Sequence, residues 1–398
     1  MIIKKIKEKL PLAVMIFILA QPLIDVLTTV STISNLSVSV GLLIRGLFMA
    51  AAFVYLFTQK KWRLPTIVLA AFLAIYCIFN AITGGLNVAG LTMLMKVFYL
   101  PVAIMFFYQF KNKLFSDKIY FYLLIVYLIL LIIPSVLGLS LIDPTNYDEK
   151  VWFRGLFFAG NDIAAVLICL SPPALWHLIK NKSWVLLSIT SFLLITATIL
   201  IGTKAMIICL IATAVFLLIQ IGKKWRPKTK IIVTSTSLIA MVGGALLLPL
   251  TPVYKNTMIA LEYHGVNSIA DIARPEIIDK VVLSERPTFF LHRAETFKVA
   301  SWDQKILGLY QNTDDKIVES DPYDIFFSVG ILGTAIYILL IVYFCCFVDW
   351  RLIAKPQKFS SILMLLIALF VGHVLITPAV ATIFALNFIK KVPNDNHR

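Results

Sequence analysis

The sequence has little charge for its length. Of its 398 residues only 14% are charged, whereas 60% are hydrophobic, and the mean hydropathy is +0.90. A soluble domain carries about a quarter charged residues, which cover its surface in water. One soluble core could not hide this much apolar surface. The composition therefore excludes an ordinary soluble enzyme and predicts a protein whose solvent is the lipid bilayer.

The sequence also lacks the usual signs of disulfides, metals and nucleotides. All five cysteines lie within apolar segments, at Cys77, Cys169, Cys209, Cys345 and Cys346. Neither a disulfide framework nor a cysteine-based metal site is therefore expected. There is no Gly-rich phosphate loop and no aspartate-rich motif in a loop expected to be cytoplasmic, which argues against a nucleotide-sugar donor. We expect no metal ion and no cofactor.

Long apolar runs fill most of the chain. A membrane-spanning helix needs about 20 mainly apolar residues. Runs of this kind lie at 11–30, 38–57, 66–83, 91–108, 119–140, 157–178, 184–201, 205–221, 231–250 and 325–347. A last run, 361–389, is interrupted by Pro378, which is expected to divide it into a span and a short tilted or re-entrant return. The sequence predicts an all-α polytopic membrane helix bundle of about 12 membrane segments, forming one integral membrane domain over residues 1–398.

The distribution of Lys and Arg predicts the orientation. The net charge of +15 does not come from a basic patch of the kind that binds nucleic acid, because the cations stand in short flanks between apolar runs. With a cytoplasmic N-terminus, the cytoplasmic flanks are all basic: 4–9, 60–63, 111–118, 180–182, 223–230, 351–358 and 390–398. The first run is expected to be an uncleaved span, because the residues after Ala20 make a poor cleavage site. The positive-inside rule then predicts a multi-pass plasma membrane protein with cytoplasmic N- and C-termini.

This orientation places one long loop, residues 251–322, on the extracytoplasmic side between the ninth and tenth membrane segments. Its mixture of charged and apolar residues predicts short amphipathic helices packed on the membrane face rather than disorder. No repeat of 20–50 residues is apparent, and neither is an inverted pair of Gly/Pro-broken spans, which many transporters show.

Three charged residues, Asp25, Arg45 and Lys96, fall within predicted spans. A charge at membrane depth is costly, so it faces a cavity or another charge. Asp25 and Arg45 could pair between neighbouring helices, and Lys96 could extend its amine to the outer interface. In the alternative interpretation the three line a path through a lipid-linked oligosaccharide flippase or another secondary transporter. The clustering of the other charges at one face and in one long loop disfavours that alternative.

Cations also gather at the predicted outer boundary, at Arg154, Lys204, Arg286 and Arg293. Arg154 precedes a Gly-Asn-Asp turn that opens an apolar run. Free backbone N–H groups and the positive end of the helix dipole favour an anion there. A helix cap by Asn161 is the alternative. Arg and Lys in such a setting bind phosphate or diphosphate.

Three carboxylates, Glu319, Asp321 and Asp324, lead into the apolar run 325–347. A carboxylate held near apolar surface and like charges binds a proton more readily than one in water, which suits a general base. Capping of the next helix by Asp321 is the alternative. With the cations, these groups predict transfer of a sugar from a lipid diphosphate carrier to an acceptor hydroxyl.

Several segments resemble a known family. RGLFFAGNDIAAVL (154–167) resembles, with altered spacing, the Arg-x-x-Gly-x-Phe-x-Asn-x-x-Ala-x-x-Leu segment of the O-antigen ligase and O-antigen polymerase superfamily. GTKAM (202–206) is similar to its Gly-Ser/Thr-Arg/Lys turn, and LSERPTFFL (283–291) with KILGLY (305–310) to its loop Arg and Leu-Gly element. KIVESDPYDIFFSVGILG (316–333), QPLIDVL (21–27) and FVGHVLITPAVA (370–381) resemble segments of Gram-positive wall- and capsular-polysaccharide members.

The resemblance implies a metal-independent glycosyltransferase of the bacterial plasma membrane, with membrane lipid and other polysaccharide assembly proteins as its expected partners. Such enzymes move a glycan from undecaprenyl diphosphate to a growing repeat unit or to a lipid or wall anchor. By the resemblance, Arg154, Lys204 and Arg286 would bind the diphosphate, and Glu319, Asp321 or Asp324 would activate the acceptor hydroxyl. A non-catalytic subunit of an assembly complex is a further alternative.

The chain departs from many O-antigen ligases at one point. Where they have His-Asn before the corresponding span, this chain has Asp321-Pro322. A base assigned by analogy with that His has no counterpart here, so His264 and His292 are outside candidates for the base.

Overall fold

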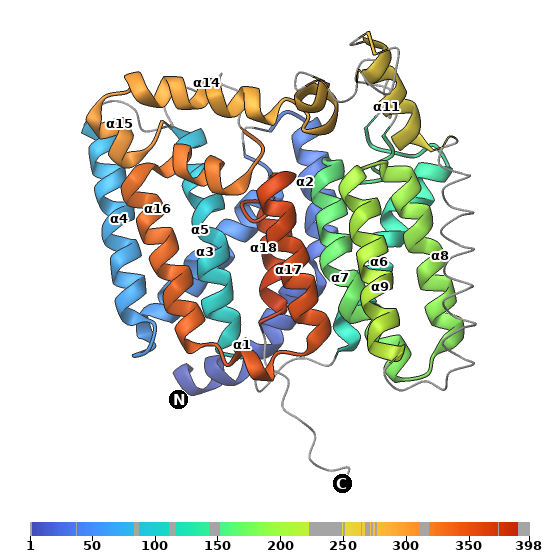
Figure 1. Cartoon of the computed structure of the whole chain (residues 1–398). Coiled ribbons are helices and arrows are strands. Elements are labelled where there is room, and N and C mark those ends of the chain that lie inside the picture. Colours follow the sequence, from blue (N-terminus) through green and yellow to red (C-terminus); the bar gives the residue numbers. More distant parts are fainter. Residues whose placement is uncertain are drawn as a thin grey trace. The chain divides into compact units, whose positions relative to one another are not determined.

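The computed structural model describes residues 2–36, 38–82, 87–110, 117–142, 152–222, 249, 251–263, 265–266, 271, 274, 277–309, 318–372 and 374–388. Within these residues every regular element is a helix (Figure 1), as the apolar runs predict. The expected span 231–250, apart from Pro249, and the candidate His264 lie outside the described residues.

The chain divides into two compact units. Unit 1 comprises residues 1–116 and 283–398, and unit 2 comprises residues 117–282. Each unit contains its own bundle of long apolar helices. The expectation of a single integral membrane domain stays a prediction.

Unit 1 is built around α5. Its helices are α1 (Ile2–Leu19), α2 (Gln21–Ile33), α3 (Val40–Thr58), α4 (Arg63–Ile82), α5 (Val88–Tyr108), α14 (Arg286–Val299), α15 (Trp302–Leu307), α16 (Asp321–Phe347), the 3-10 helix η3 (Trp350–Leu352), α17 (Lys355–Phe370) and α18 (Pro378–Leu386). Helix α5 packs against α3, α16 and α18. Every α5 residue from 97 to 108 is buried. An all-round apolar helix of this kind belongs at the centre of a bundle.

Unit 2 is built around α7. Its described elements are α6 (Lys118–Val136), α7 (Gly160–Lys180), α8 (Trp184–Ile201), α9 (Lys204–Gly222), α11 (Pro252–Tyr263) and the π-helical turn η2 (Ile278–Val282). Helix α7 packs against α6, α8 and α9. Most of its length is buried, whereas α8 and α9 each leave an apolar face exposed, as lipid-facing helices do.

Eight described helices are long and apolar enough to cross a membrane: α3, α4, α5, α6, α7, α8, α9 and α16. Residues 9–19 of α1 together with α2 make a ninth candidate, bent by 53° at the break between them. The chain is therefore a multi-pass membrane protein. The expected count of about 12 segments is not reached among the described residues, and one expected span lies outside them.

The last apolar run is divided as expected. Helix α17 ends at Phe370 and α18 begins at Pro378, so the predicted division at that proline is confirmed. Helix α18 has nine residues, all of them buried. A helix of that length measures about 14 Å, roughly half of the hydrocarbon thickness of a bilayer. By this length α18 is a short return rather than a full span.

The bend between α1 and α2 has a local cause. Pro22 stands in the first turn of α2 and has no backbone N–H, so one helical hydrogen bond is missing at the break. The side chain of Gln21 donates at the same break to a different carbonyl, because its Nε2 lies 3.0 Å from the carbonyl oxygen of Phe17.

The described residues of the long loop form short helices, α11, η2, α14 and α15, as the sequence predicts. Figure 1 shows α14 lying across the end of the long helices of unit 1, near the start of α16. The side of the membrane on which this loop lies stays a prediction.

Candidate active site

The three carboxylates expected before a span lie together at the start of α16, in unit 1. Asp321 and Asp324 occupy its first turn, and Glu319 precedes the N-cap residue, Ser320. The alternative that Asp321 is the cap is therefore wrong. Asp321 and Asp324 are 1% and 2% exposed, whereas the side chain of Glu319 is 35% exposed. Of the three carboxylates, only that of Glu319 is therefore accessible to a substrate.

Asp321 binds the connection between α17 and α18. Its two carboxylate oxygens both accept from the backbone N–H of Val374 at 3.1 Å, and one accepts from that of Leu375 at 2.6 Å. Buried backbone amides need such a partner, because an unpaired amide away from water is costly. Asp321 therefore fixes residues 374–375 against the start of α16.

Asp324 binds the segment that leads into its own helix. One of its carboxylate oxygens accepts from the backbone N–H of Val318 and the other from that of Ser320, each at 2.9 Å. The hydroxyl of Ser320 in turn donates to the carbonyl of Leu369, near the end of α17, at 2.9 Å. Asp324 and the Ser320 hydroxyl therefore hold residues 318–320 between α16 and α17.

The backbone of Glu319 lies directly against that of Gly372. Glu319 has φ 60° and Gly372 has φ 71°, so both adopt the left-handed conformation. A Cβ on Gly372 would lie 2.0 Å from the carbonyl oxygen of Glu319. Only glycine fits at this approach, since it has no Cβ and tolerates positive φ. The close packing positions Glu319 while its carboxylate remains partly exposed.

Arg286, the first residue of α14, joins three segments. Its Nε donates to the carbonyl of Glu319, and its Nη2 donates to the Glu319 carboxylate and to the carbonyl of Val371, each at 3.1 Å. Its Nη1 donates to the carbonyl of Leu283, also at 3.1 Å. A guanidinium has five N–H groups. The fifth, on Nη1, has no partner among the described residues.

Arg293 lies two turns further along α14 and is 8% exposed. Its positive charge interacts electrostatically with Asp324, as does the negative charge of Glu319. The neighbouring His292, an outside candidate for the base, is exposed on the same helix. Unit 1 therefore brings two of the four expected cations together with all three expected carboxylates.

The other two cations, Arg154 and Lys204, lie in unit 2. Arg154 donates from Nη1 to the carbonyl of Phe158 at 3.0 Å, and its guanidinium lies 5.7 Å from the centre of the Trp152 ring. These contacts fold the segment that leads into α7. Helix α7 begins at Gly160 after the N-cap residue Ala159, which makes no side-chain cap. The alternative that Asn161 caps α7 is wrong.

The segment around Arg154 is fixed to the ends of two helices. The backbone N–H of Phe153 donates to the carbonyl of Leu200, in the last turn of α8, at 3.1 Å. At Gly155, with φ 56°, a Cβ would lie 2.5 Å from the carbonyl oxygen of Leu131, near the end of α6. The segment therefore lies where α6 and α8 end and where α7 and α9 begin.

Lys204 is exposed and is the first residue of α9. It follows Gly202, whose φ of 68° ends α8 in the left-handed conformation. The Phe153–Leu200 hydrogen bond thus brings Arg154 to the end of unit 2 where α9 starts. Two cations and the positive ends of two helix dipoles make this end of unit 2 suitable for an anion.

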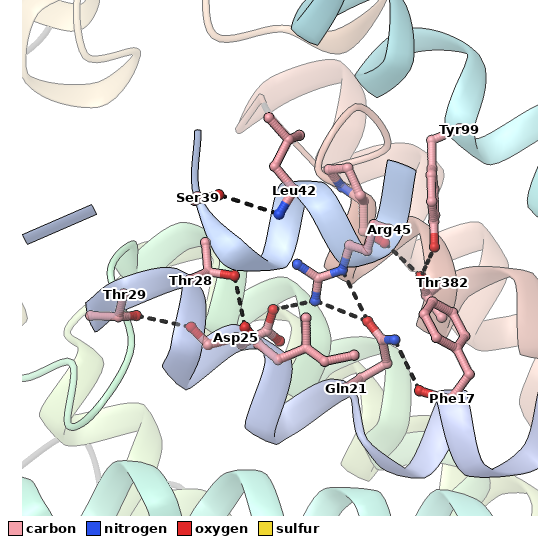
Figure 2. A network of polar contacts seen from close by, with 12 residues as sticks. Phe17, Gln21, Asp25, Thr28, Thr29, Ser39, Leu42, Arg45, Tyr99 and Thr382 are labelled. Atoms are coloured by element: carbon pink, nitrogen blue, oxygen red, sulfur yellow. Dashed lines mark hydrogen bonds and ion pairs between the residues drawn. The ribbon is translucent and has the colours of Figure 1, made fainter. Parts of the chain in front are cut away.

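Inside unit 1, Arg45 of α3 pairs with Asp25 of α2 (Figure 2), which is one of the two arrangements that the sequence leaves open. Arg45 is only 4% exposed. Its Nε and Nη2 also donate to Oε1 of Gln21, at 3.1 Å and 2.9 Å. Figure 2 shows Tyr99 and Thr382 beside this group, joined by a 2.8 Å hydrogen bond between α5 and α18. The two buried charges satisfy each other, which is what a structural pair requires.

Lys96, the third intramembrane charge, lies on α5 and is half-buried. Its amine makes no hydrogen bond and no ion pair with any other described residue. Gln21 is the partner that the sequence analysis missed. The spacing could have indicated it, because Gln21 stands four positions before Asp25 and therefore lies on the same face of a helix.

A comparison with models of protein families matches the chain to the family described as O-antigen ligase like membrane protein, over residues 7–271 and 267–390. A search of curated proteins found no match. A search of solved structures likewise found none. The matched residues include both cation groups, the three carboxylates and the intramembrane charges. Because the match covers nearly the whole length, the chain belongs to the O-antigen ligase like family of membrane proteins.

Proposed function

We propose that this protein transfers or polymerises a glycan carried on undecaprenyl diphosphate, at the outer face of the bacterial plasma membrane. The family supports the general class, because its members are membrane proteins of polysaccharide assembly with glycosyltransferase-type activity. One observation carries the proposal furthest. At the start of α16 the Glu319 carboxylate stays partly exposed beside Arg286, while Asp321 and Asp324 are buried and bind backbone.

In the proposal, cations bind the diphosphate of the donor. Arg154 and Lys204 bind it in unit 2, where uncapped backbone N–H groups at the start of α7 add donors. In unit 1, Arg286 with its remaining Nη1 N–H and Arg293 beside the carboxylates are the other two cations that the resemblance and the charge pattern assign to the diphosphate. Stabilising the departing diphosphate is the larger part of catalysis, because negative charge builds up there in the transition state.

Glu319 is the proposed general base. The acceptor hydroxyl oxygen attacks the anomeric carbon, its proton passes to Glu319, and the bond from that carbon to the diphosphate oxygen breaks. The electron pair of that bond leaves with undecaprenyl diphosphate, and the configuration at the anomeric carbon inverts. Asp321 and Asp324 act as positioning residues in this scheme, because Asp324 binds the backbone N–H groups on both sides of Glu319 and Asp321 fixes residues 374–375 against the start of α16.

The proposed location, the outer face of the membrane, rests on the distribution of basic residues along the chain. The basic flanks of the apolar runs favour a cytoplasmic N-terminus, which puts residues 251–322 and the start of α16 outside. Cysteine accessibility at Lys298→Cys, an exposed position on α14, tests this orientation directly.

The activity itself is tested with purified full-length protein in vesicles and an undecaprenyl-diphosphate-linked oligosaccharide, without any other enzyme. We expect consumption of the donor and release of undecaprenyl diphosphate. A longer lipid-linked chain as product identifies a polymerase, and a glycan attached to an added wall or lipid acceptor identifies a ligase. Donor left intact by protein that is folded and correctly inserted contradicts the proposal and favours a non-catalytic subunit.

A further inference from the structure

Helices α14 and α15 present two different faces. On one face Phe290, Ala294 and Phe297 of α14 pack against a buried cluster that includes Leu309 and Phe327. This face fixes α14 and α15 to the start of α16, and α15 also packs directly against α16. The packing leaves the other face of the two helices uncovered by the described chain.

The uncovered face carries a compact apolar patch where the two helices meet. Val299 ends α14 and is 86% exposed, and Trp302 begins α15 and is 78% exposed. Ile306, one helical turn after Trp302, is 43% exposed. We call Val299, Trp302 and Ile306 the junction patch. Large apolar side chains gathered in this way mark a contact surface rather than a face covered by water.

The geometry of the junction patch is fixed. Ser301 and Gln304 form a capping box at the start of α15, in which the backbone N–H of Ser301 donates to Gln304 Oε1 at 3.3 Å. A capping box sets the entry of a helix, and here it holds Trp302 as the first helical residue. The position of the Trp302 indole is therefore fixed by regular helical structure.

Cations border the junction patch. Lys305 Nζ lies 5.6 Å from the centre of the Trp302 ring and donates to the carbonyl of Lys298 at 2.8 Å. Lys298 is itself exposed, in the last turn of α14. An amphipathic indole with lysines beside it is the combination found where a protein meets the headgroup region of a bilayer.

The helix against which α15 packs has a lipid-exposed apolar face of its own. Helix α16, on which α15 packs, exposes a row of apolar residues along its length: Ile331 at 51%, Ile338 at 55%, Leu339 at 60% and Val342 at 52%. Helix α16 is long and apolar enough to cross a membrane. Its exposed apolar residues therefore face acyl chains. Figure 1 shows α14 and α15, the helices that carry the junction patch, at the same end of unit 1 as the start of α16.

We propose that the junction patch anchors α14 and α15 to the bilayer, with the Trp302 indole at the boundary between headgroups and acyl chains and the two lysines at the phosphates. The anchor sets the depth of α14, whose first residue, Arg286, binds Glu319. It therefore holds the candidate active site at the level where a lipid-linked donor presents its diphosphate.

The test is quenching of tryptophan fluorescence by brominated lipids in the full-length protein. Wild type and Trp302→Phe are reconstituted in phosphatidylcholine–phosphatidylglycerol vesicles with bromine at carbons 6 and 7 or at carbons 11 and 12. The chain has seven tryptophans, so the difference between the two proteins reports Trp302 alone. Trp62→Phe is the matched control, because Trp62 is 0% exposed.

We expect the Trp302 contribution to be quenched strongly by the 6,7-dibromo lipid and less by the 11,12-dibromo lipid. The Trp62 contribution should change much less with either. The proposal is overturned if Trp302 is quenched by aqueous iodide and unaffected by either lipid. It is also overturned if a soluble oligosaccharide, rather than lipid, protects Trp302 from iodide, since the patch would then bind glycan.

Discussion

Arg286 and Glu319 are joined twice, through an ion pair from Nη2 to Oε2 and a hydrogen bond from Nε to the Glu319 carbonyl, each at 3.1 Å. The same guanidinium also binds the carbonyl of Val371. One side chain thus links the start of α14, the segment before α16 and the end of α17. Arg286 can stabilise the candidate site only because its planar fork reaches these carbonyls together.

Arg286→Lys is expected to weaken this arrangement although it keeps the charge. An ammonium group cannot reproduce the fork that donates to Glu319 and Val371. We expect a clear fall in the melting temperature of the detergent-solubilised protein and a fall in transfer rate of about tenfold or more, which corresponds to about 1.4 kcal/mol. Arg274→Lys is the control, because Arg274 forms an exposed ion pair with Asp271. Equal effects of the two substitutions would argue against a special role for Arg286.

Gly372→Ala tests the backbone contact with Glu319. The new Cβ would lie 2.0 Å from the Glu319 carbonyl, so residues 318–320 must move. Gly138→Ala is a matched control, since Gly138 has φ 69° but nothing within 4 Å of the added Cβ. Positive φ alone costs alanine about 1 kcal/mol, so Gly138→Ala should remain active and nearly as stable as wild type.

Gly372→Ala should lose most of its transfer activity, measured in vesicles beside the Gly138→Ala variant. Activity and melting temperature that match those of the control would show that the Glu319–Gly372 contact does not position the site.

Removing one member of the Arg45–Asp25 pair is expected to destabilise the protein more than removing both. Asp25→Asn leaves Arg45 charged and only 4% exposed, and removal of one partner of a buried pair costs about 3–5 kcal/mol. Asp25→Asn combined with Arg45→Gln should recover much of that loss. Unfolding of the three variants in mixed micelles measures the coupling. Additive losses in the double variant contradict the assignment of a structural pair.

Arg154→Ala and Lys204→Ala are expected to weaken donor binding. Each removes a cation from the end of unit 2 where two helices begin, so we expect KM for the lipid-linked donor to rise about tenfold, with weaker dependence on salt. Lys182→Ala is the control, because Lys182 is exposed in the turn between α7 and α8. An unchanged KM in both test variants would show that Arg154 and Lys204 do not bind the donor.

The helices could be predicted from the sequence because they depend on local composition, whereas for Asp25 and Arg45 the sequence left an ion pair and a transport path both open. Apolar runs of span length fold as helices wherever they occur in lipid, and a charge at membrane depth either pairs with an opposite charge or extends to the interface. Pro378 divides the last run because proline lacks an N–H, which is also a local property.

The different roles of the three carboxylates could not be predicted in the same way. The amides that bind Asp321 lie 53 and 54 residues further along the chain, and only the folded structure brings them to the start of α16. From the sequence alone, the three carboxylates were therefore equally good candidates for the general base. The break in α16 at Gly330, with φ 65°, was also missed, because its cause is the close approach of Gly308 and Ile306 to residues 328–330.

The most direct test of the central proposal is the single-turnover rate of glycan transfer by Glu319→Gln, with donor saturating. Gln keeps the size of the side chain and can still accept from Arg286, but it cannot take a proton. Glu295→Gln, at an exposed position of α14, is the control. We expect the control to match wild type and Glu319→Gln to lose about 100-fold or more in rate, with donor affinity little changed. A Glu319→Gln rate equal to that of wild type would contradict the assignment of Glu319 as the base.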